Sequence, residues 1–238
     1  MATAGYPPGV HVRIRLFAGI RERAGTGSLE LELADGATVA EVWPALDLGD
    51  EPAGLLYAVN KRYVEREAAL APGDEVAVIP PVSGGEGATE AAADARGSEP
   101  RARFRLSEEP LSVEDAVAQV RDDRAGAIAT FVGTTRATSR GREVLHLEYE
   151  AYEGMAEQVM AELAERLTRE HELCGVAIHH RVGRVDVGET SVVIAVSAPH
   201  RRAALTACAE AIDELKVTVP LWKKELYVGG EEWIGRGS

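Results

Sequence analysis

Lysine is rare in this chain and is concentrated at one place. The sequence has 22 arginines but only four lysines, and three of the four, Lys216, Lys223 and Lys224, fall within nine residues. Arginine stays protonated at any reachable pH, whereas a partly buried lysine can titrate and act as a general acid or base. The cluster therefore indicates a site that transfers protons; a solvated basic surface near the end of a helix is the alternative.

A second basic group stands where a helix is predicted to begin. His200, Arg201 and Arg202 follow Pro199 and precede an apolar helical pattern. A helix N-terminus presents free N–H groups and the positive end of the helix dipole, and guanidinium groups add charge-assisted donors. We expect this group to bind a phosphate or another anion, although His200 by itself is more typical of a helix cap or a surface histidine.

A loop rich in glycine, threonine and arginine follows a buried strand at residues 131–141 (FVGTTRATSRG). Arg136 is the candidate anion contact in this loop, and Thr134 and Thr135 can assist it with backbone or hydroxyl groups. A plain surface loop also explains this segment when it is taken alone.

Two histidines and two cysteines receive no assignment. His179 and His180 lie in a predicted strand, where alternation of the side chains lets at most one of them point inward. Cys174 and Cys208 are 34 residues apart and lack the spacing of a metal site or a disulfide framework, so they are interpreted as small buried side chains. No set of His, Cys and Asp residues indicates a metal site.

The net charge of −13 disfavours binding to nucleic acid or to an anionic membrane surface. An anionic ligand must then be held by a local basic cluster that works against the overall field. The N-terminus lacks a signal-peptide pattern, and no apolar stretch approaches the roughly 20 residues of a membrane helix. We therefore expect a soluble, cytoplasmic protein.

Residues 86–100 (EGATEAAADARGSEP) contain no aromatic residue and no aliphatic residue larger than alanine. Such a segment cannot bury enough apolar surface to offset the entropy of ordering it, so we predict a disordered linker. The chain then divides into a first domain at 1–85, the linker at 86–100 and a second domain at 101–238.

Both domains are predicted to be α+β. The first domain has a short helical stretch that ends near Gly25, a helix that starts at Thr38 and runs through Leu46, where Glu41 completes a capping box, and strands at 10–18, 29–33, 55–60 and 74–80. One helix across a mixed sheet in this order is a β-grasp pattern, although periodicity alone leaves it one of several options. The second domain has predicted helices at 113–120, 153–171 and 201–216, strands at 127–135, 143–152, 176–183 and 191–198, and an extended segment at 221–228.

The first domain ends in Gly84-Gly85, shortly after its last predicted strand. Taken alone, two glycines at a domain edge are usually the start of a linker. At the end of a β-grasp domain they are also the arrangement of carrier proteins whose terminal carboxylate is activated. Glycine suits that role because a residue without Cβ allows close approach of the backbone in a narrow site.

Residues 57–85 closely resemble the C-terminal half of the molybdopterin synthase small subunit, MoaD, through the motifs VN, GDEVA and PPVSGG. The resemblance implies a ubiquitin-like sulfur carrier whose terminal glycine, here Gly85, becomes a thiocarboxylate. In this chain, however, Gly85 is bonded to Glu86, and an amide carbonyl cannot be adenylated. We therefore expect a protease to cleave after Gly85 and an adenylating, sulfur-loading enzyme to act on the new terminus.

Five motifs of the second domain resemble the large, catalytic subunit, MoaE, in that family's order: FVGTTR, LEYEAYEGMAE, IHHRVGRVDVGE, VSAPHRRAAL and ELKVTVPLWKKE. The resemblance implies an α/β-hammerhead-type MoaE-like fold and a homodimer through residues 101–238. It also implies the roles of the site residues. Lys216 and Lys223 are catalytic, and the substrate-binding residues are Thr134, Thr135, Arg136, His200, Arg201, Lys224 and Glu225.

The implied activity is molybdopterin synthase. Two sulfurs pass from carrier thiocarboxylates to cyclic pyranopterin monophosphate and form the dithiolene of molybdopterin, with no metal or other cofactor. Two other functions stay open. The first domain could be a non-donating structural module while a separate carrier supplies the sulfur. The chain could also bind pterin or nucleotide phosphates without turnover, although Lys216 and Lys223 argue against this.

Overall fold

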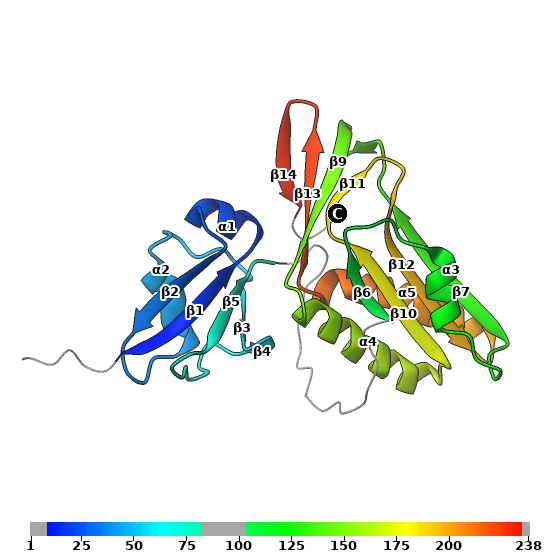
Figure 1. Ribbon diagram of the computed structural model, residues 1–238, viewed down its shortest axis with the longest axis horizontal. Helices are drawn as coiled ribbons and strands as arrows, with labels where there is room; N and C mark the ends of the chain where they lie inside the picture. Colours follow the sequence, from blue (N-terminus) through cyan, green and yellow to red (C-terminus); the bar gives the residue numbers. More distant parts are fainter. Residues whose placement is uncertain (1–8, 82–102, 235–238) are drawn as a thin grey trace, which may run out of the picture. The chain divides into compact units, whose positions relative to one another are not determined.

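The computed structural model describes residues 9–81 and 103–234, which belong to two compact units divided between Pro81 and Val82. Each unit has its own sheet structure and its own hydrophobic core (Figure 1). The α+β prediction is confirmed for both units. The predicted linker and the Gly84-Gly85 tail lie outside the described residues.

The first unit is a five-stranded mixed sheet with the order β2-β1-β5-β3-β4. The β1 and β5 strands are parallel, and the other neighbours are antiparallel, as a β-grasp fold requires. Its elements are β1 (Val10–Leu16), α1 (Ala18–Ala24), β2 (Ser28–Leu33), η1 (Val39–Glu41), α2 (Val42–Leu46), β3 (Leu56–Val59), β4 (Arg62–Val64) and β5 (Glu75–Ile79). Of these strands, only the three-residue β4 was not predicted.

Alternation in the sequence explains how this unit folds. Val12 and Ile14 of β1 are fully buried, whereas the alternate residues His11 and Arg13 are exposed, so one face of the sheet forms the core. Helix α2 covers that face with Val42 and Trp43. The predicted capping box is present, since the Thr38 N–H donates to Glu41 Oε2 at 2.5 Å.

The second unit contains two sheets. One has the order β6-β10-β12-β7, and the other has the order β11-β9-β13-β14, with β8 paired to β9. The strands are β6 (Phe104–Ser107), β7 (Ala127–Thr134), β8 (Thr138–Ser139), β9 (Arg142–Ala151), β10 (Gly175–Arg181), β11 (Gly183–Asp186), β12 (Thr190–Ala198), β13 (Leu221–Tyr227) and β14 (Gly230–Ile234). The helices are α3 (Val113–Gln119), α4 (Met155–His171) and α5 (Arg201–Thr218).

Both faces of the β6-β10-β12-β7 sheet are covered. Helices α4 and α5 pack on one face in the main core, and α3 packs on the other face. Every residue of β10 is therefore buried, including His179 at 1% and His180 at 4% exposure. The prediction that at most one of these histidines points inward is wrong, because a strand covered on both faces has no outward side.

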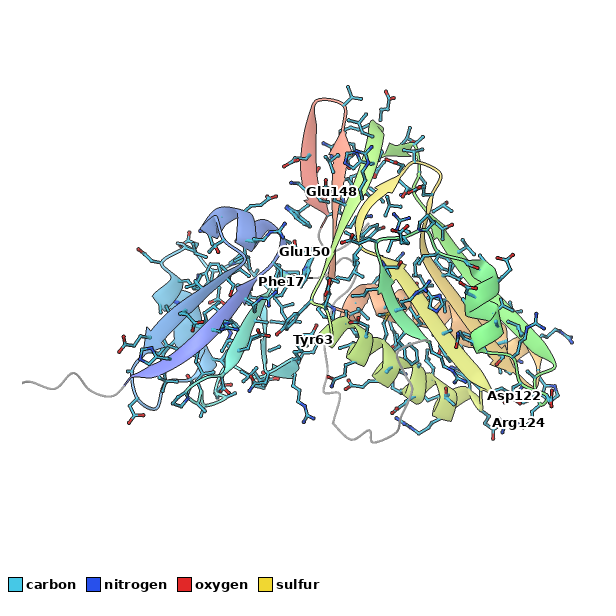
Figure 2. All side chains as sticks on the ribbon, viewed as in Figure 1. Phe17, Tyr63, Asp122, Arg124, Glu148 and Glu150 are labelled. Atoms are coloured by element: carbon cyan, nitrogen blue, oxygen red, sulfur yellow. The ribbon has the colours of Figure 1, made fainter. Side chains whose placement is uncertain are left out.

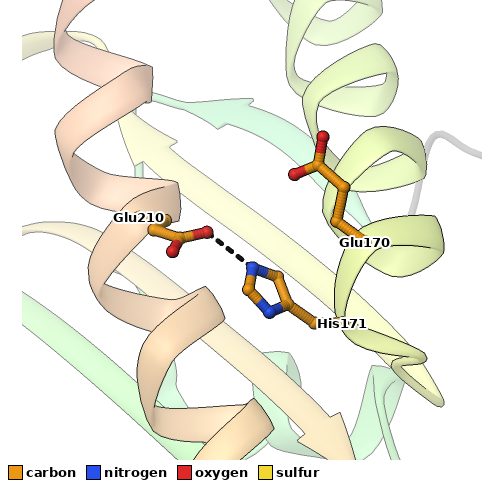
Figure 3. Close-up of side chains that lie close together, drawn as sticks. All are labelled: Glu170, His171 and Glu210. Carbon is orange, nitrogen blue, oxygen red and sulfur yellow. Dashed lines mark hydrogen bonds and ion pairs between the residues drawn. The ribbon is translucent and has the colours of Figure 1, made fainter.

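Ion pairs join α4 to α5 at their surface. His171 Nε2 lies 2.6 Å from Glu210 Oε2 across the two helices (Figure 3). Arg166 of α4 pairs with Glu214 of α5 and with Glu170 of its own helix. Within residues 9–81 and 103–234, no helix is both long and apolar enough to span a membrane.

Candidate functional site

Strand β13 carries the lysines on its two opposite faces. Lys223 lies opposite Tyr149 of β9, whereas Lys224 lies opposite Glu148 of the same strand. Because side chains alternate along a strand, Lys223 shares its face with Glu225 and Tyr227 and not with Lys224. The two adjacent lysines of the sequence motif therefore lie in two different environments.

Lys223 and Glu225 form a largely buried ion pair. Lys223 Nζ lies 3.1 Å from Glu225 Oε1, and the two side chains are 16% and 4% exposed. The Tyr227 hydroxyl donates to the other carboxylate oxygen of Glu225, Oε2. Burial alone raises the pKa of Glu225, but hydrogen bonds from Tyr227 and Ser139 together with the Lys223 ammonium hold this pKa below its usual value. Glu225 thus carries its charge inside the protein.

Lys224 has different neighbours. Its ammonium lies 2.5 Å from Glu231 Oε1 and 5.6 Å from the centre of the Trp233 ring. Its partner across the strands, Glu148, stands with Glu150 on β9 (Figure 2). Acidic and aromatic groups therefore surround Lys224, which fits a role in binding or structure better than one in proton transfer.

The threonine–arginine loop is tied to this strand. Thr134 ends β7, and Ser139, in β8, donates a side-chain hydrogen bond to Glu225. Arg136 and Thr134 are exposed, whereas Thr135 is buried. The Thr135 N–H already donates to the Glu189 carbonyl at 3.0 Å, so this amide is committed to the fold. Arg136 is the exposed cationic member of the predicted Thr134–Arg136 contact and is open to a ligand.

Helix α5 separates the remaining basic residues. His200 is its N-cap, Arg201 is its first residue, and Lys216 lies in its last turn; all three are exposed. Fifteen residues of α-helix span about 22 Å. Within one chain, Arg201 and Lys216 therefore cannot contact the same small ligand.

The sheet register shows which end each group occupies. Thr134 pairs with Thr190 at the start of β12, and Ala127 pairs with Ala198 at its end, two residues before His200. Helix α5 then runs back along β12 and β7, which brings Lys216 to the Thr134 end. Tyr149 connects Lys223 to this end because Tyr149 bonds to Ser191, the neighbour of Thr190.

Apart from Lys224, which lies on the other face of β13, the predicted site residues of the second unit thus form two groups. The first, which we name the lysine end, consists of Thr134, Thr135, Arg136, Lys216, Lys223 and Glu225. The second, the helix-start group, consists of His200 and Arg201 at the opposite end of the sheet. The sequence motifs predicted that all of these residues line one pocket. Within a single chain, however, the two groups lie at opposite ends of the sheet.

The lysine end contains residues that the sequence motifs did not reveal. Tyr149 packs edge-on against His180 with 4.8 Å between the ring centres, and burial raises the pKa of its hydroxyl. Tyr227 binds Glu225 from two residues along the strand. Alternation along LWKKELYV is the signal that could have found Tyr227, since it places this residue on the same face as Lys223.

His180 is held neutral in this core. Burial lowers its pKa from 6.5 to about 4, while its Nδ1–H donates to the Arg181 carbonyl at 2.7 Å. The unfolded chain therefore binds a proton below about pH 6.5 that the folded chain does not accept until about pH 4. The contribution of His180 to stability is complete above pH 6.5 and is lost as the pH falls toward 4.

We expect this acid loss to amount to about 3 kcal/mol between pH 7 and pH 4. Urea unfolding of the full chain measures it, with Trp43→Phe in every sample so that Trp222 and Trp233 report the second unit. His180→Asn keeps a donor for the Arg181 carbonyl and should flatten the pH dependence by that amount, whereas the exposed control His200→Asn should not. Parallel pH curves for His180→Asn and the parent would contradict the prediction.

One group among the described residues has the spacing of a metal site: Glu170, His171 and Glu210, whose ligand atoms lie within 4.8 Å of one another. The sequence did not indicate it, because the members come from two helices. Arg166 lies 2.7 Å from Glu170, so a guanidinium already balances the charge of this carboxylate. We interpret this group as a link between α4 and α5.

Comparison with known proteins finds a matching family for each of the two units. The family model described as MoaE protein matches residues 106–218, and the model described as ThiS family matches residues 14–85. The molybdopterin synthase catalytic subunit of Bacillus subtilis is 46% identical over 133 residues, which cover 56% of this chain and 85% of that protein. The corresponding subunit of Culex quinquefasciatus is 50% identical over 134 residues, which cover 55% and 85%.

A solved structure agrees with the sequence relatives. The structure of molybdopterin synthase from Staphylococcus aureus has a TM-score of 0.54 and 34% identity, and covers 56% of this chain and 97% of that one. The MoaE match lies within the second unit, and the ThiS match covers most of the first. The chain therefore acts in molybdopterin biosynthesis: it belongs to the molybdopterin synthase catalytic subunit family and carries a ThiS-type, MoaD-like sulfur-carrier domain fused at its N-terminal side.

Proposed function

We propose that this chain is a sulfurtransferase that makes molybdopterin from cyclic pyranopterin monophosphate with sulfur carried as a thiocarboxylate on Gly85. The observation that supports the proposal most strongly is that the ThiS match ends at Gly85, immediately before the internal peptide bond to Glu86. One gene product thus supplies both the carrier and the domain that uses it. The two sulfurs of a dithiolene require two loaded carriers for each product.

The chemistry fits the residues of the lysine end. The thiocarboxylate sulfur forms a bond to a substrate carbon in place of a C–O bond, whose oxygen leaves as water or with the opened phosphate, and the carrier stays attached as a thioester. Water then cleaves the thioester and releases Gly85 as a carboxylate. These steps, and the opening of the cyclic phosphate, need proton transfers that Lys216 and Lys223 can supply. Glu225 keeps the Lys223 ammonium in place within a largely buried pair.

The phosphate of the substrate needs cationic donors. We assign it to Arg136, His200 and Arg201, with Thr134, Thr135 and Lys224 in supporting roles. Because the helix-start group lies about 22 Å from Lys216 within one chain, we infer that a second copy supplies His200 and Arg201 to the lysine end of the first. The homodimer through residues 101–238 is then part of the site. No cofactor takes part.

Cleavage after Gly85 is the step that separates this proposal from its rival. In protein purified from its native host, intact mass should show a polypeptide that ends at Gly85, part of it with one oxygen replaced by sulfur. Full-length chain alone, together with full activity, would refute cleavage. It would support a first domain that is structural while a separate carrier donates.

Reconstitution from two pieces tests the transfer itself. A loaded 1–85 piece, first shown by circular dichroism to fold, is mixed with 86–238 and substrate, and single-turnover formation of the dithiolene is followed. The matched control is a 1–86 piece, in which Gly85 remains an amide and cannot be loaded. Sulfur should leave the 1–85 piece only. If the loaded carrier never loses its sulfur to 86–238, the proposal is contradicted. The remaining explanation is then that the chain binds its ligand without turnover.

A further inference from the structure

The buried carboxylate of Glu225 has a different partner on each oxygen. Oε1 lies 3.1 Å from Lys223 Nζ, and Oε2 accepts a hydrogen bond from the Tyr227 hydroxyl. All three residues share one face of β13, with Glu225 at the centre. A hydrogen bond to one oxygen restrains the rotation of the carboxylate, so its other oxygen keeps its direction toward the ammonium.

Tyr227 is itself fixed in place. It is 3% exposed and packs with Val144 and Leu147 in a small apolar cluster. The Arg142 guanidinium lies 3.7 Å over the centre of its ring and pairs with Glu232, which stands opposite Glu225 on β14. The hydroxyl therefore has a defined position, which a positioning role requires.

We propose that Tyr227 is a positioning residue for Lys223: its hydroxyl holds Oε2 of Glu225, so that Oε1 stays directed at the Lys223 ammonium. The inference rests on the proposed function, because it assigns a new role within the same site. Tyr227 acts through Glu225 and is not itself a catalytic residue.

The charged and titratable neighbours support this arrangement. Tyr149 faces Lys223 from β9, with His180 of β10 packed against its ring. Arg142 and Glu232 flank Tyr227 and form an ion pair with each other. The donors to Glu225 are then Tyr227, Ser139 and Lys223, and together they keep the pKa of this carboxyl below its usual value despite its burial.

Tyr227→Phe tests the inference because it removes the hydroxyl and keeps the ring beneath Arg142. The first measurement is the titration of the Glu225 side-chain carboxyl by carbon-13 NMR, with neither carrier nor substrate present. We expect the midpoint to move to higher pH, since one hydrogen bond to the charged form is lost. An unchanged midpoint overturns the inference, and this result does not depend on whether the chain transfers sulfur.

The second measurement is the kinetics of sulfur transfer. Tyr227→Phe should lower kcat about tenfold, as expected for the loss of one hydrogen bond to a charged group, with KM changed less than twofold. In a Glu225→Gln background the same change should have no further effect, because Tyr227 acts only through Glu225. Independent, multiplying losses in the double variant would indicate a general structural role and overturn the inference.

The first unit offers a matched control. Tyr57 donates its hydroxyl to Glu51 at 3.2 Å and lies beneath Arg66, 5.4 Å from the ring centre, so it has similar Tyr, Glu and Arg neighbours in the unit that does not carry Lys223. Tyr57→Phe should leave both the Glu225 titration and kcat unchanged. A loss of kcat equal to that of Tyr227→Phe would show that any such bond matters, and would overturn the specific assignment.

Discussion

Lys216→Ala should lower the rate of sulfur transfer by about a thousandfold while leaving the fold intact. Lys216 is exposed in the last turn of α5, so the loss of its side chain opens no cavity and breaks no core contact. Single-turnover loss of sulfur from the loaded carrier measures the rate, and thermal unfolding measures the fold. A rate within a few-fold of the parent would remove Lys216 from the mechanism.

Two further variants separate proton transfer from charge. Lys216→Arg keeps the positive charge but cannot titrate, so it should stay close to the alanine variant in rate. Arg169→Ala removes an exposed basic residue from the last turn of α4 and is the matched control for helix-end charge. It should keep the parental rate. Recovery of the rate in Lys216→Arg would mean that the charge of Lys216 is sufficient and that its proton is not used.

Regular alternation and capping made most of the fold predictable. The capping box of Thr38 and Glu41 and the alternating β1 were recognised because each depends on residues close together in the chain. Strands β4, β6, β8, β11 and β14 were missed, and each has only two to five residues. So short a segment has too few positions for a period to appear, and its pairing depends on partners that are distant in sequence.

Sequence motifs indicated which residues to place in the candidate site, but they did not show its geometry. Lysine scarcity indicated Lys216 and Lys223, and the helix start indicated Arg201. Spacing along the chain does not show that α5 carries Arg201 away from Lys216, because that follows from the length of the helix and the register of β7 with β12. Burial of both His179 and His180 was also missed, since it depends on helices that cover both faces of the sheet.

Mixed dimers provide the sharpest test of a site built from two copies. As a homodimer, the Lys216→Ala variant should be inactive. The Arg201→Ala homodimer should transfer sulfur about a hundredfold more slowly than the parent, because the substrate phosphate is misplaced. In a dimer of one chain of each kind, one site combines the intact lysine end of one copy with the intact helix-start group of the other. About half of the parental activity should therefore return in mixed dimers purified through two different affinity tags.

The control for complementation uses two changes at the same end. A mixed dimer of Lys216→Ala with Lys223→Ala has a damaged lysine end in both copies, so neither of its sites is complete and it should remain inactive. If the mixed dimer of Lys216→Ala with Arg201→Ala also remains inactive, the lysine end and the helix-start group act within one chain. Because α5 holds them about 22 Å apart, that result would require the helix to break on substrate binding, which the unbroken run from Arg201 to Thr218 argues against.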